Sequence, residues 1–310
     1  MNKITHINAK TLDEAVKALG PTANVIAGGT DLYGTLKSMC LPKPPDTIVN
    51  LKTIPGLDYI KVESGTLKIG PLATLTSIAE SSVVRSQWSS LADAAGRVAS
   101  PSLRNMGTIA GNMCQRSRCW YFRAEHDAFL CFRKGGETCF GVAGDNRYLA
   151  IMGGQLCFQS FPSDTGIALC ALNASVVTTQ QTIAARDFWV VLGNKLKDNE
   201  IIKEIQVPAP AAGTKQAFLK YADRKSIDFA TASCAVVLTA TDAVIYLGAA
   251  GPLPIRATTA EDAIKGKAVD ATSAQAAADA AVSRAVPQSM NRHKVQIMKT
   301  IVRRTLLAAK

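Results

Sequence analysis

The cysteines of this chain are clustered, and the clustering restricts how the chain can fold. Five of the eight lie in one segment, namely Cys114, Cys119, Cys131, Cys139 and Cys157. Thiols that only fill a core are scattered along a sequence, so this cluster predicts an irregular segment, at about residues 113–158, that brings sulfur atoms together. Such sulfur atoms bind zinc or an iron–sulfur cluster, or pair as disulfides.

The overall composition is that of a soluble globular protein. Of the 310 residues, 47% are hydrophobic and 19% are charged, which suits two or three domains. The opening residues MNKITHINAKTLDEAV lack the apolar stretch of a signal peptide. Residues 230–251 are apolar, but Asp242 interrupts them and favours two buried strands over a membrane span. We expect a cytoplasmic protein with no membrane partner. It would be periplasmic only if it were exported together with a signal-bearing partner subunit. Structural disulfides are disfavoured in the cytoplasm.

The chain is basic, with a formal net charge of +11. A basic surface can bind nucleic acid, or it can meet an acidic partner or simply keep the protein soluble. No zinc-finger, helix-turn-helix or RNA-recognition signature accompanies the charge. We therefore expect no nucleic-acid partner.

The first half of the chain alternates short helices and strands. Thr11 followed by Glu14 predicts a capped helix over residues 11–19. Strands are expected at residues 23–29 and 46–51, and a hairpin at residues 59–70 with Ser64 and Gly65 at its turn. Helices are expected at residues 75–81 and 89–99. The segment after Leu103 is expected to be irregular and to contain the cysteines.

The second half begins with a helix that feeds a strand, over residues 163–179. Pro208 and Pro210 then mark a linker between two domains, which we place at residues 1–208 and 215–310. The second domain has strands at 216–222, 233–238 and 243–248, followed by an alanine-rich helix and a basic amphipathic helix. These elements predict an independent α/β domain.

Two glycine loops have the composition of phosphate-binding turns. The first, AGGTDL at residues 27–32, follows a predicted strand, and its adjacent glycines allow backbone N–H groups to approach a phosphate. The second, PSLRNMGTIAGN at residues 101–112, combines Gly107 and Gly111 with Thr108 and Asn112. Neither loop is a Rossmann or P-loop motif, and a tight turn without a ligand is the alternative for each. Together they suit a pyrophosphate.

Five motifs in order give the chain a resemblance to a known family. They are AGGTDL, PSLRNMGTIAGN, SDTGIAL (residues 163–169), FLKYADRKSIDFA (218–230) and GPLPIRA (251–257). In this order they resemble the FAD-binding subunit of the molybdenum hydroxylases, the group of xanthine dehydrogenase, aldehyde oxidoreductase and carbon monoxide dehydrogenase. The resemblance implies an α+β fold: a non-Rossmann, two-subdomain FAD-binding domain (PCMH-like) over residues 1–208, then a C-terminal α/β domain of the CO dehydrogenase flavoprotein type over residues 215–310.

The resemblance also implies which residues bind FAD. They are Ala27, Gly28, Gly29, Thr30, Asp31, Leu32, Thr108, Gly111, Asn112, Asp164, Ile205 and Lys220. For Asp164 the alternative is a helix N-cap, because it opens a predicted helix. For Lys220 the alternative is a solvated strand residue.

The spacing of the cysteines favours iron–sulfur over zinc. Only Cys114 and Cys119 are close, with four residues between them, whereas structural zinc uses tight pairs of cysteines. Resemblance to the flavin subunits that carry an extra cysteine-bearing loop implies a [4Fe–4S] cluster bound by Cys119, Cys131, Cys139 and Cys157. It leaves Cys114 as a spare thiol, although either Cys114 or Cys157 could complete the set. The aromatic residues between positions 120 and 148 would shield the cluster or form a small loop core.

The implied function is electron transfer. The chain lacks the C-x₄-C-x₂-C run of a plant-type [2Fe–2S] subunit, so a separate [2Fe–2S] small subunit and a molybdopterin-containing large subunit are expected as partners. Electrons would pass through FAD and the [4Fe–4S] cluster to a ferredoxin-like, quinone or oxygen acceptor. No residue is assigned as a catalytic acid, base or nucleophile. The alternatives are a self-sufficient flavin oxidoreductase with a structural cysteine loop and a zinc-stabilised binding module.

Overall fold

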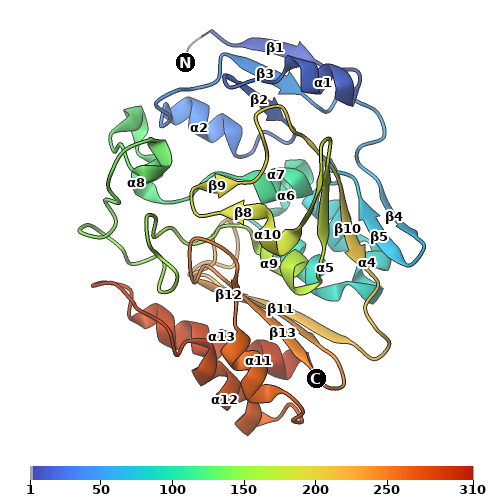
Figure 1. Cartoon of the computed structure of the whole chain (residues 1–310), viewed down its shortest axis with the longest axis vertical. Coiled ribbons are helices and arrows are strands. Elements are labelled where there is room, and N and C mark those ends of the chain that lie inside the picture. The colour runs from blue at the N-terminus through green and yellow to red at the C-terminus, as the bar shows by residue number, and fades with distance from the viewer. Residues whose placement is uncertain (1–2, 310) are drawn as a thin grey trace.

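The computed structural model describes residues 3–309. Figure 1 shows an elongated molecule with a small sheet at the N-terminal end and a group of helices at the C-terminal end. Between them lies a five-stranded sheet with helices packed against it. The polypeptide therefore forms three sheet-based layers along its long axis.

The N-terminal sheet is parallel and has the strand order β1 (Thr5–Asn8), β3 (Thr47–Asn50), β2 (Ala23–Ile26). Helices α1 (Leu12–Ala18) and α2 (Leu32–Ser38) connect these strands. Thr11 caps α1 as predicted, since its hydroxyl accepts the Glu14 N–H at 3.1 Å. The Glu14 carboxylate accepts from the N–H of Lys10 and not from that of Thr11. The first glycine loop runs from the end of β2 into α2.

The middle sheet is antiparallel. Its strand order is β4 (Ile60–Glu63), β5 (Thr66–Ile69), β10 (Ile202–Pro208), β6 (Ser175–Thr178), β7 (Thr182–Ala184). The predicted hairpin turn is confirmed, with Ser64 and Gly65 at positive φ. Helices α3 (Leu75–Glu80), α4 (Ser82–Gln87), α5 (Ser89–Gly96), α6 (Pro101–Met106), α7 (Ile109–Cys114) and α9 (Asp164–Ala171) belong to this layer. Trp88 and Leu67 are fully buried where the helices meet the sheet.

A short hairpin leaves this layer near the cysteine segment. Helix α10 (Ala185–Phe188) leads directly into β8 (Trp189–Val190), which pairs with β9 (Gly193–Asn194). Phe161, Phe188 and Trp189 pack edge to face at its base, with ring centroids 5.0 to 5.1 Å apart. These ring contacts fix the hairpin on the core of the middle layer.

The C-terminal sheet is antiparallel, in the order β11 (Lys215–Tyr221), β12 (Ala232–Leu238), β13 (Ala243–Gly248), β14 (Ile255–Arg256). One face packs on α5 and α9, and the other packs on α11 (Thr258–Ile264), α12 (Ala271–Ala281) and α13 (His293–Ala308). Because both faces are covered, β12 is almost entirely buried. This explains why SCAVVL is a continuous apolar run and does not alternate with polar residues.

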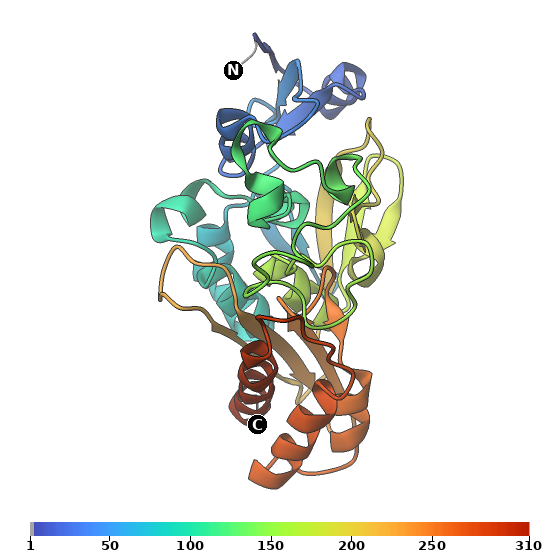
Figure 2. The ribbon, with the colours of Figure 1, turned by 90° about the vertical axis from the view of Figure 1, so that its left-hand side faces the viewer.

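The cysteine segment crosses the surface of all three layers. Between residues 115 and 163 it has only the short helix α8 (Trp120–Arg123) and the 3-10 turns η1 (Glu125–Asp127) and η2 (Phe132–Lys134). Figure 2 shows it running down one side of the molecule, from the N-terminal sheet toward the C-terminal helices. Tyr121, Phe129 and Phe140 pack together, with ring centroids 5.0 to 6.4 Å apart, so the aromatic residues form a small core of the loop.

Lys294 of α13 fastens the end of this segment to the C-terminal layer. Its side chain is fully buried, and Nζ donates to the carbonyl oxygens of Tyr148, Leu149 and Ala249 and to Ser160 Oγ, at 2.8 to 3.1 Å. Burial lowers the pKa of Lys294 to about 7. These hydrogen bonds satisfy the backbone oxygens of a segment that has no sheet partner.

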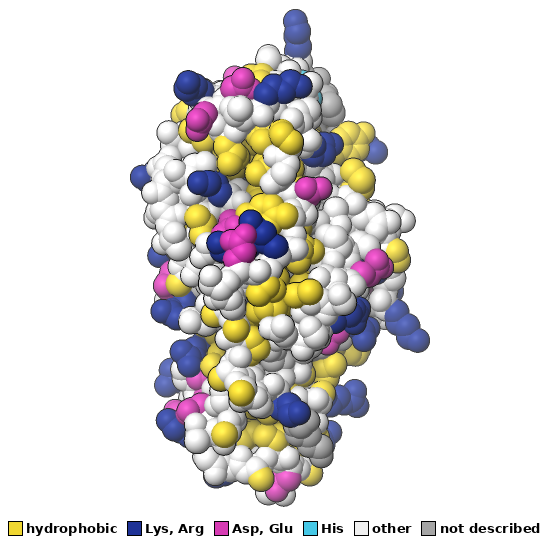
Figure 3. Space-filling model, turned by 90° about the vertical axis from the view of Figure 1, so that its right-hand side faces the viewer, with side chains coloured by type: hydrophobic (Ala, Val, Ile, Leu, Met, Phe, Trp, Pro, Cys, Tyr) yellow, Lys and Arg dark blue, Asp and Glu magenta, His cyan; other side chains and the backbone are white. Residues whose placement is uncertain are grey.

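None of the helices in residues 3–309 is long and apolar enough to cross a membrane. Figure 3 shows one face of the molecule, on which basic side chains are scattered among acidic and apolar ones and form no single continuous patch.

Candidate functional site

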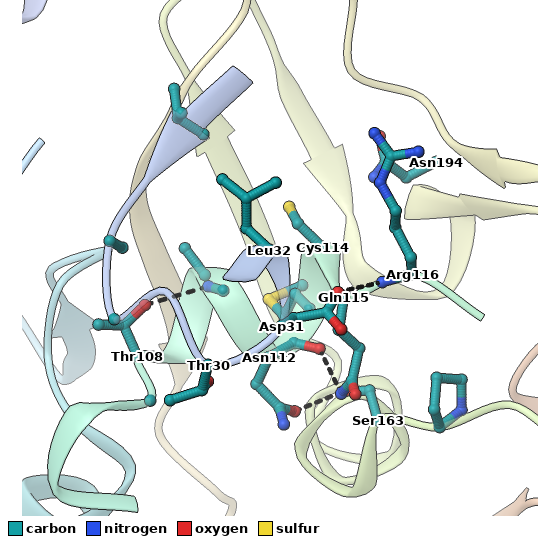
Figure 4. A pocket seen from close by; sticks show the side chains of 18 of the residues that line it. Thr30, Asp31, Leu32, Thr108, Asn112, Cys114, Gln115, Arg116, Ser163 and Asn194 are labelled. Atoms are coloured by element: carbon teal, nitrogen blue, oxygen red, sulfur yellow. Dashed lines mark hydrogen bonds between the residues drawn. The ribbon is translucent and has the colours of Figure 1, made fainter. Parts of the chain in front are cut away.

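A cavity of about 760 Å³ opens where the N-terminal layer, the middle layer and the C-terminal sheet meet. Both glycine loops line this cavity, which we call the large cavity (Figure 4). The structure brings eleven of the twelve predicted FAD-binding residues to it: Ala27, Gly28, Gly29, Thr30, Asp31, Leu32, Thr108, Gly111, Asn112, Asp164 and Lys220. Ile205 differs, because it is fully buried in the core of the middle sheet and does not line the cavity.

The two glycine loops touch each other through their backbones. A Cβ atom at Gly28 would lie 1.9 Å from the carbonyl oxygen of Met106, in the middle of the second loop. Gly29 has a φ of 70°, in the left-handed region that favours glycine. The pair of glycines is therefore required by the close approach of the loops and by the turn at the end of β2.

Asn112 organises the polar wall of the second loop. Its Oδ1 accepts hydrogen bonds from Ser163 Oγ at 2.7 Å and Thr165 Oγ1 at 2.6 Å (Figure 4 shows Asn112 and Ser163). Thr108 caps α7 by accepting the Gly111 N–H at 3.2 Å. The helix-cap alternative for Asp164 is wrong, because Ser163 is the residue that caps α9.

Asp164 forms a buried ion pair with Lys220. Lys220 Nζ lies 2.7 Å from Asp164 Oδ2, and each side chain is only 7% exposed. Nζ also donates to the carbonyl oxygens of Arg97 at 3.1 Å and Asp228 at 2.9 Å. Burial raises the pKa of Asp164, and the charge and hydrogen bond of Lys220 oppose that rise. The solvated alternative for Lys220 is therefore wrong: the residue joins α9 to the C-terminal sheet at the cavity wall.

Asp31 binds the start of the cysteine segment, a contact that the sequence did not reveal. Its carboxylate accepts the Arg116 N–H at 2.8 Å and pairs with the guanidinium groups of Arg118 at 2.9 Å and Arg123 at 2.6 Å (Figure 4 shows Asp31 and Arg116). Burial lowers the pKa of Arg118 to about 10, although Asp31 opposes the shift. The basic run in CQRSRCWYFR was the only sequence signal for this cluster, and it did not identify the acidic partner.

Two further parts of the large cavity were also missed from the sequence. The β8–β9 hairpin contributes Val190 and Asn194, and the loop after β11 contributes Ile227 and Phe229. Ile227 has a φ of 55°, a strained conformation for a β-branched residue, and its N–H donates to the carbonyl oxygen of Ala99. This loop lies in the motif FLKYADRKSIDFA, which marked the region without predicting its conformation.

A second, smaller cavity lies within the cysteine segment. Four thiols line it, those of Cys119, Cys131, Cys139 and Cys157. We call it the thiol cavity. Cys114 does not line it. That residue ends α7, packs against the core of the middle layer, and has its pKa raised to about 12 by burial.

The sulfur atoms of the thiol cavity have basic neighbours. Arg133 Nε donates to Cys157 Sγ at 3.1 Å, and the positive charge of Lys134 opposes the rise that burial causes in the pKa of Cys131. Burial, together with the neighbouring thiols of Cys157 and Cys139, raises the pKa of Cys119 to about 11. Four sulfur donors with adjacent cations are the donor set that a zinc ion or an iron–sulfur cluster uses.

The thiol cavity is narrow. Its volume is about 20 Å³, enough for about one water molecule. In the part of the chain that the structure describes, no group of three or more His, Cys, Asp or Glu side chains is arranged to hold a metal ion. The four thiols thus share one cavity and supply the donor chemistry of a metal centre, but in the described residues they are not arranged around a metal ion.

Three residues line both cavities: Phe122, Arg133 and Gln159. They form a shared wall between the glycine loops and the thiols. Gln159 is 5% exposed, and its Oε1 has no hydrogen-bond partner. A buried acceptor without a partner is uncommon in a folded chain, so Gln159 Oε1 is available to a group bound at this wall.

Comparisons with known proteins identify the family. Residues 2–210 match the family of the FAD binding domain in molybdopterin dehydrogenase, and residues 217–309 match the CO dehydrogenase flavoprotein C-terminal domain. The chain therefore belongs to the FAD-binding subunits of the molybdenum hydroxylase family. The predicted fold, an FAD-binding domain followed by a CO dehydrogenase flavoprotein C-terminal domain, is confirmed.

Individual relatives cover nearly the whole chain. The aldehyde oxidoreductase FAD-binding subunit PaoB of Escherichia coli is 30% identical over 94% of this chain and 92% of its own length. The carbon monoxide dehydrogenase medium chain of Hydrogenophaga pseudoflava is 29% identical over 97% of this chain and 94% of its own length. The solved structure of carbon monoxide dehydrogenase from H. pseudoflava matches with a TM-score of 0.78 and 28% identity, over 99% of this chain and 97% of that one. The chain is thus an FAD-binding oxidoreductase component.

Proposed function

We propose that this chain is the electron-transfer flavin subunit of a heteromeric molybdenum hydroxylase that oxidises aldehydes or N-heterocycles of the xanthine kind. It would take electrons from the [2Fe–2S] centre of a small subunit onto FAD and pass them, with a [4Fe–4S] cluster, to an external acceptor. A molybdopterin-containing large subunit would oxidise the substrate. The observation that carries the proposal is the shared wall, because it puts four thiols beside the cavity formed by the two glycine loops.

The residues of the large cavity divide into three roles. The backbone of residues 27–32 and of the second loop would bind the pyrophosphate of FAD, because both line the large cavity and their glycines let the backbone approach a phosphate closely. Asn112, Ser163 and Thr165 would hold the second loop in place through their hydrogen bonds. Asp164 would hydrogen-bond the cofactor while the ion pair with Lys220 holds its side chain in place. Ile205 would contribute only by supporting the sheet beneath the cavity.

The four thiols of the thiol cavity would bind the cluster, with Cys114 as a bystander. Cys114 lies apart from the other four, which share one cavity. When bound, a [4Fe–4S] cluster supplies a one-electron centre. The packed rings of Tyr121, Phe129 and Phe140 would limit the access of water to it. We also propose that residues 1–208 and 215–310 are separate domains, with the cysteine segment at about 113–158 as an insertion.

An external one-electron acceptor suits this arrangement. A ferredoxin-like protein, a quinone or oxygen could receive electrons from a centre that lies in a surface segment. A cytoplasmic location fits free thiols, because that compartment keeps cysteines reduced.

The test is cofactor analysis of the anaerobically purified chain, alone and with its partner subunits. We expect a flavin absorption spectrum together with iron and acid-labile sulfide. Cys139→Ser should lose the iron and sulfide but keep the flavin, whereas Cys114→Ser, the matched control, should keep all three. A flavoprotein without iron would refute the cluster, and colourless protein that takes up no FAD would refute the flavin site.

The same purification separates the alternatives. A self-sufficient flavin oxidoreductase would purify without two other chains and turn over its substrate alone. A zinc-stabilised binding module would contain zinc in place of flavin, and any nucleic-acid binding would weaken steeply with salt.

A further inference from the structure

Arg133 is the one charged residue of the shared wall, and it contacts elements on both sides. It belongs to the turn η2, which follows Cys131 directly. Its Nε donates to Cys157 Sγ at 3.1 Å, so it reaches from one predicted sulfur ligand to another that lies far along the segment. Phe122 and Gln159, the other two wall residues, carry no charge.

The second arm of the same guanidinium binds the β8–β9 hairpin. Arg133 Nη2 donates to the carbonyl oxygen of Val191, the first residue of the turn between the two strands. The adjacent residues Val190 and Leu192 line the large cavity. The planar guanidinium of Arg133 therefore connects the Cys157 thiol to the wall of the large cavity. Its fork geometry fixes the distance between that thiol and the β8–β9 hairpin.

A cation that donates a hydrogen bond to a sulfur ligand affects the redox chemistry of the metal centre. Reduction adds negative charge to an iron–sulfur cluster, and a donor or positive charge at the sulfur stabilises that charge. In a partly buried site the effect is larger than in water, because the dielectric screening is weaker. Lys134 also lies near the thiols, but it forms an ion pair with Asp127 at 2.7 Å, which offsets its charge.

We propose that Arg133 is a positioning residue that joins the two cavities: its guanidinium holds the Cys157 sulfur at the shared wall and raises the reduction potential of the iron–sulfur centre. The inference rests on the proposed function, since it requires the cluster. It adds a role for a residue that is neither a ligand nor part of a glycine loop. Its consequence is that electron transfer from the flavin to the cluster is more favourable with Arg133 than without it.

The test is a potentiometric titration of the cluster, followed by electron paramagnetic resonance, on the full chain with its partner subunits. In Arg133→Gln we expect at least a tenfold fall in the ratio of reduced to oxidised cluster at a given potential, which is about 59 mV for a one-electron centre. Arg133→Lys should give a smaller fall, because lysine keeps the charge but not the fork. Arg147→Gln is the matched control: this arginine of the same segment pairs with Asp145 at the surface and should leave the potential unchanged.

The outcomes are distinct. Arg133→Gln with full iron and the wild-type potential would overturn the inference and leave the proposed function standing. If Arg133→Gln loses iron, Arg133→Lys decides: a lowered potential supports the inference, and an unchanged one overturns it. Wild-type protein with FAD but no iron would overturn the inference together with the proposed cluster.

Discussion

Replacing Lys220 by methionine should destabilise the protein in a pH-dependent way. Lys220 makes three contacts in a nearly dry environment, to the Asp164 carboxylate and to the carbonyl oxygens of Arg97 and Asp228. Methionine has a similar length but no charge and no donor. The variant therefore leaves the carboxyl of Asp164 buried at the cavity wall without its cation.

The magnitude follows from the proton that Asp164 can take up. Neutralising a carboxyl of ordinary pKa, about 3.9, costs about 4 kcal/mol at pH 7 and about 1.5 kcal/mol at pH 5. Because Asp164 can take up a proton, the penalty for leaving its carboxylate buried and unpaired cannot exceed the cost of neutralising it. The value of about 4 kcal/mol at pH 7 lies in the range measured for broken buried ion pairs. Loss of the two hydrogen bonds to carbonyl oxygens adds about 1 kcal/mol each at either pH. We expect a total loss of about 6 kcal/mol at pH 7 and about 3.5 kcal/mol at pH 5.

The direction in which the stability of the variant changes with pH follows from proton linkage. Burial raises the pKa of Asp164 in the folded protein, and loss of Lys220 raises it further. The folded variant then binds more protons than the unfolded chain between the two pKa values, so its stability falls as the pH rises through that window. Below the unfolded pKa of about 3.9 the charge penalty disappears.

Urea denaturation at pH 5 and pH 7 measures the effect, with tryptophan fluorescence as the signal, because Trp88 and Trp189 are buried in the middle layer. Lys215→Met, an exposed lysine on the same strand, is the matched control and should change little. Adding Asp164→Asn to Lys220→Met should abolish the difference between the two pH values. An equal loss at pH 5 and pH 7 in Lys220→Met alone would contradict the predicted protonation of Asp164.

Two further predictions follow from close packing and from buried donors. Gly28→Ala places a Cβ 1.9 Å from the carbonyl oxygen of Met106, so the glycine loops must separate, at a cost of about 1–3 kcal/mol. Flavin titration should show weaker FAD binding, whereas Gly34→Ala, which has no neighbour within 4 Å and lies outside the large cavity, should bind FAD normally. Lys294→Met removes four buried hydrogen bonds at once, although Asn291 Nδ2 still donates to the Leu149 carbonyl oxygen and Ser160 Oγ to that of Ala249, and it should lower the free energy of unfolding by about 3 kcal/mol in urea. Lys299→Met, on the same helix but partly exposed, should change it by less than 1 kcal/mol, and an equal loss in both would contradict the role of the buried donor.

The local structure and the family could be predicted from the amino-acid sequence. The glycine pair of AGGTDL, the hairpin turn at Ser64 and Gly65, and the cap at Thr11 were all predicted, because each depends on backbone preferences of a few adjacent residues. The order of the five motifs identified the flavoprotein family, and with it the residues that line the large cavity. Ile205 shows the limit of this transfer, since a motif match gives a position on a strand and not the face that the side chain occupies.

The contacts between these elements could be identified only in the folded chain. Asp31 meets Arg118 and Arg123, and Lys220 meets Asp164, across long stretches of chain that come together when three layers pack. No pattern of nearby residues encodes such pairs, because the identity of a buried partner depends on which surfaces meet. The resemblance already left Cys114 as the spare thiol, and the fold places it apart from the other four, but nothing in the sequence put Arg133 in the wall that the two cavities share.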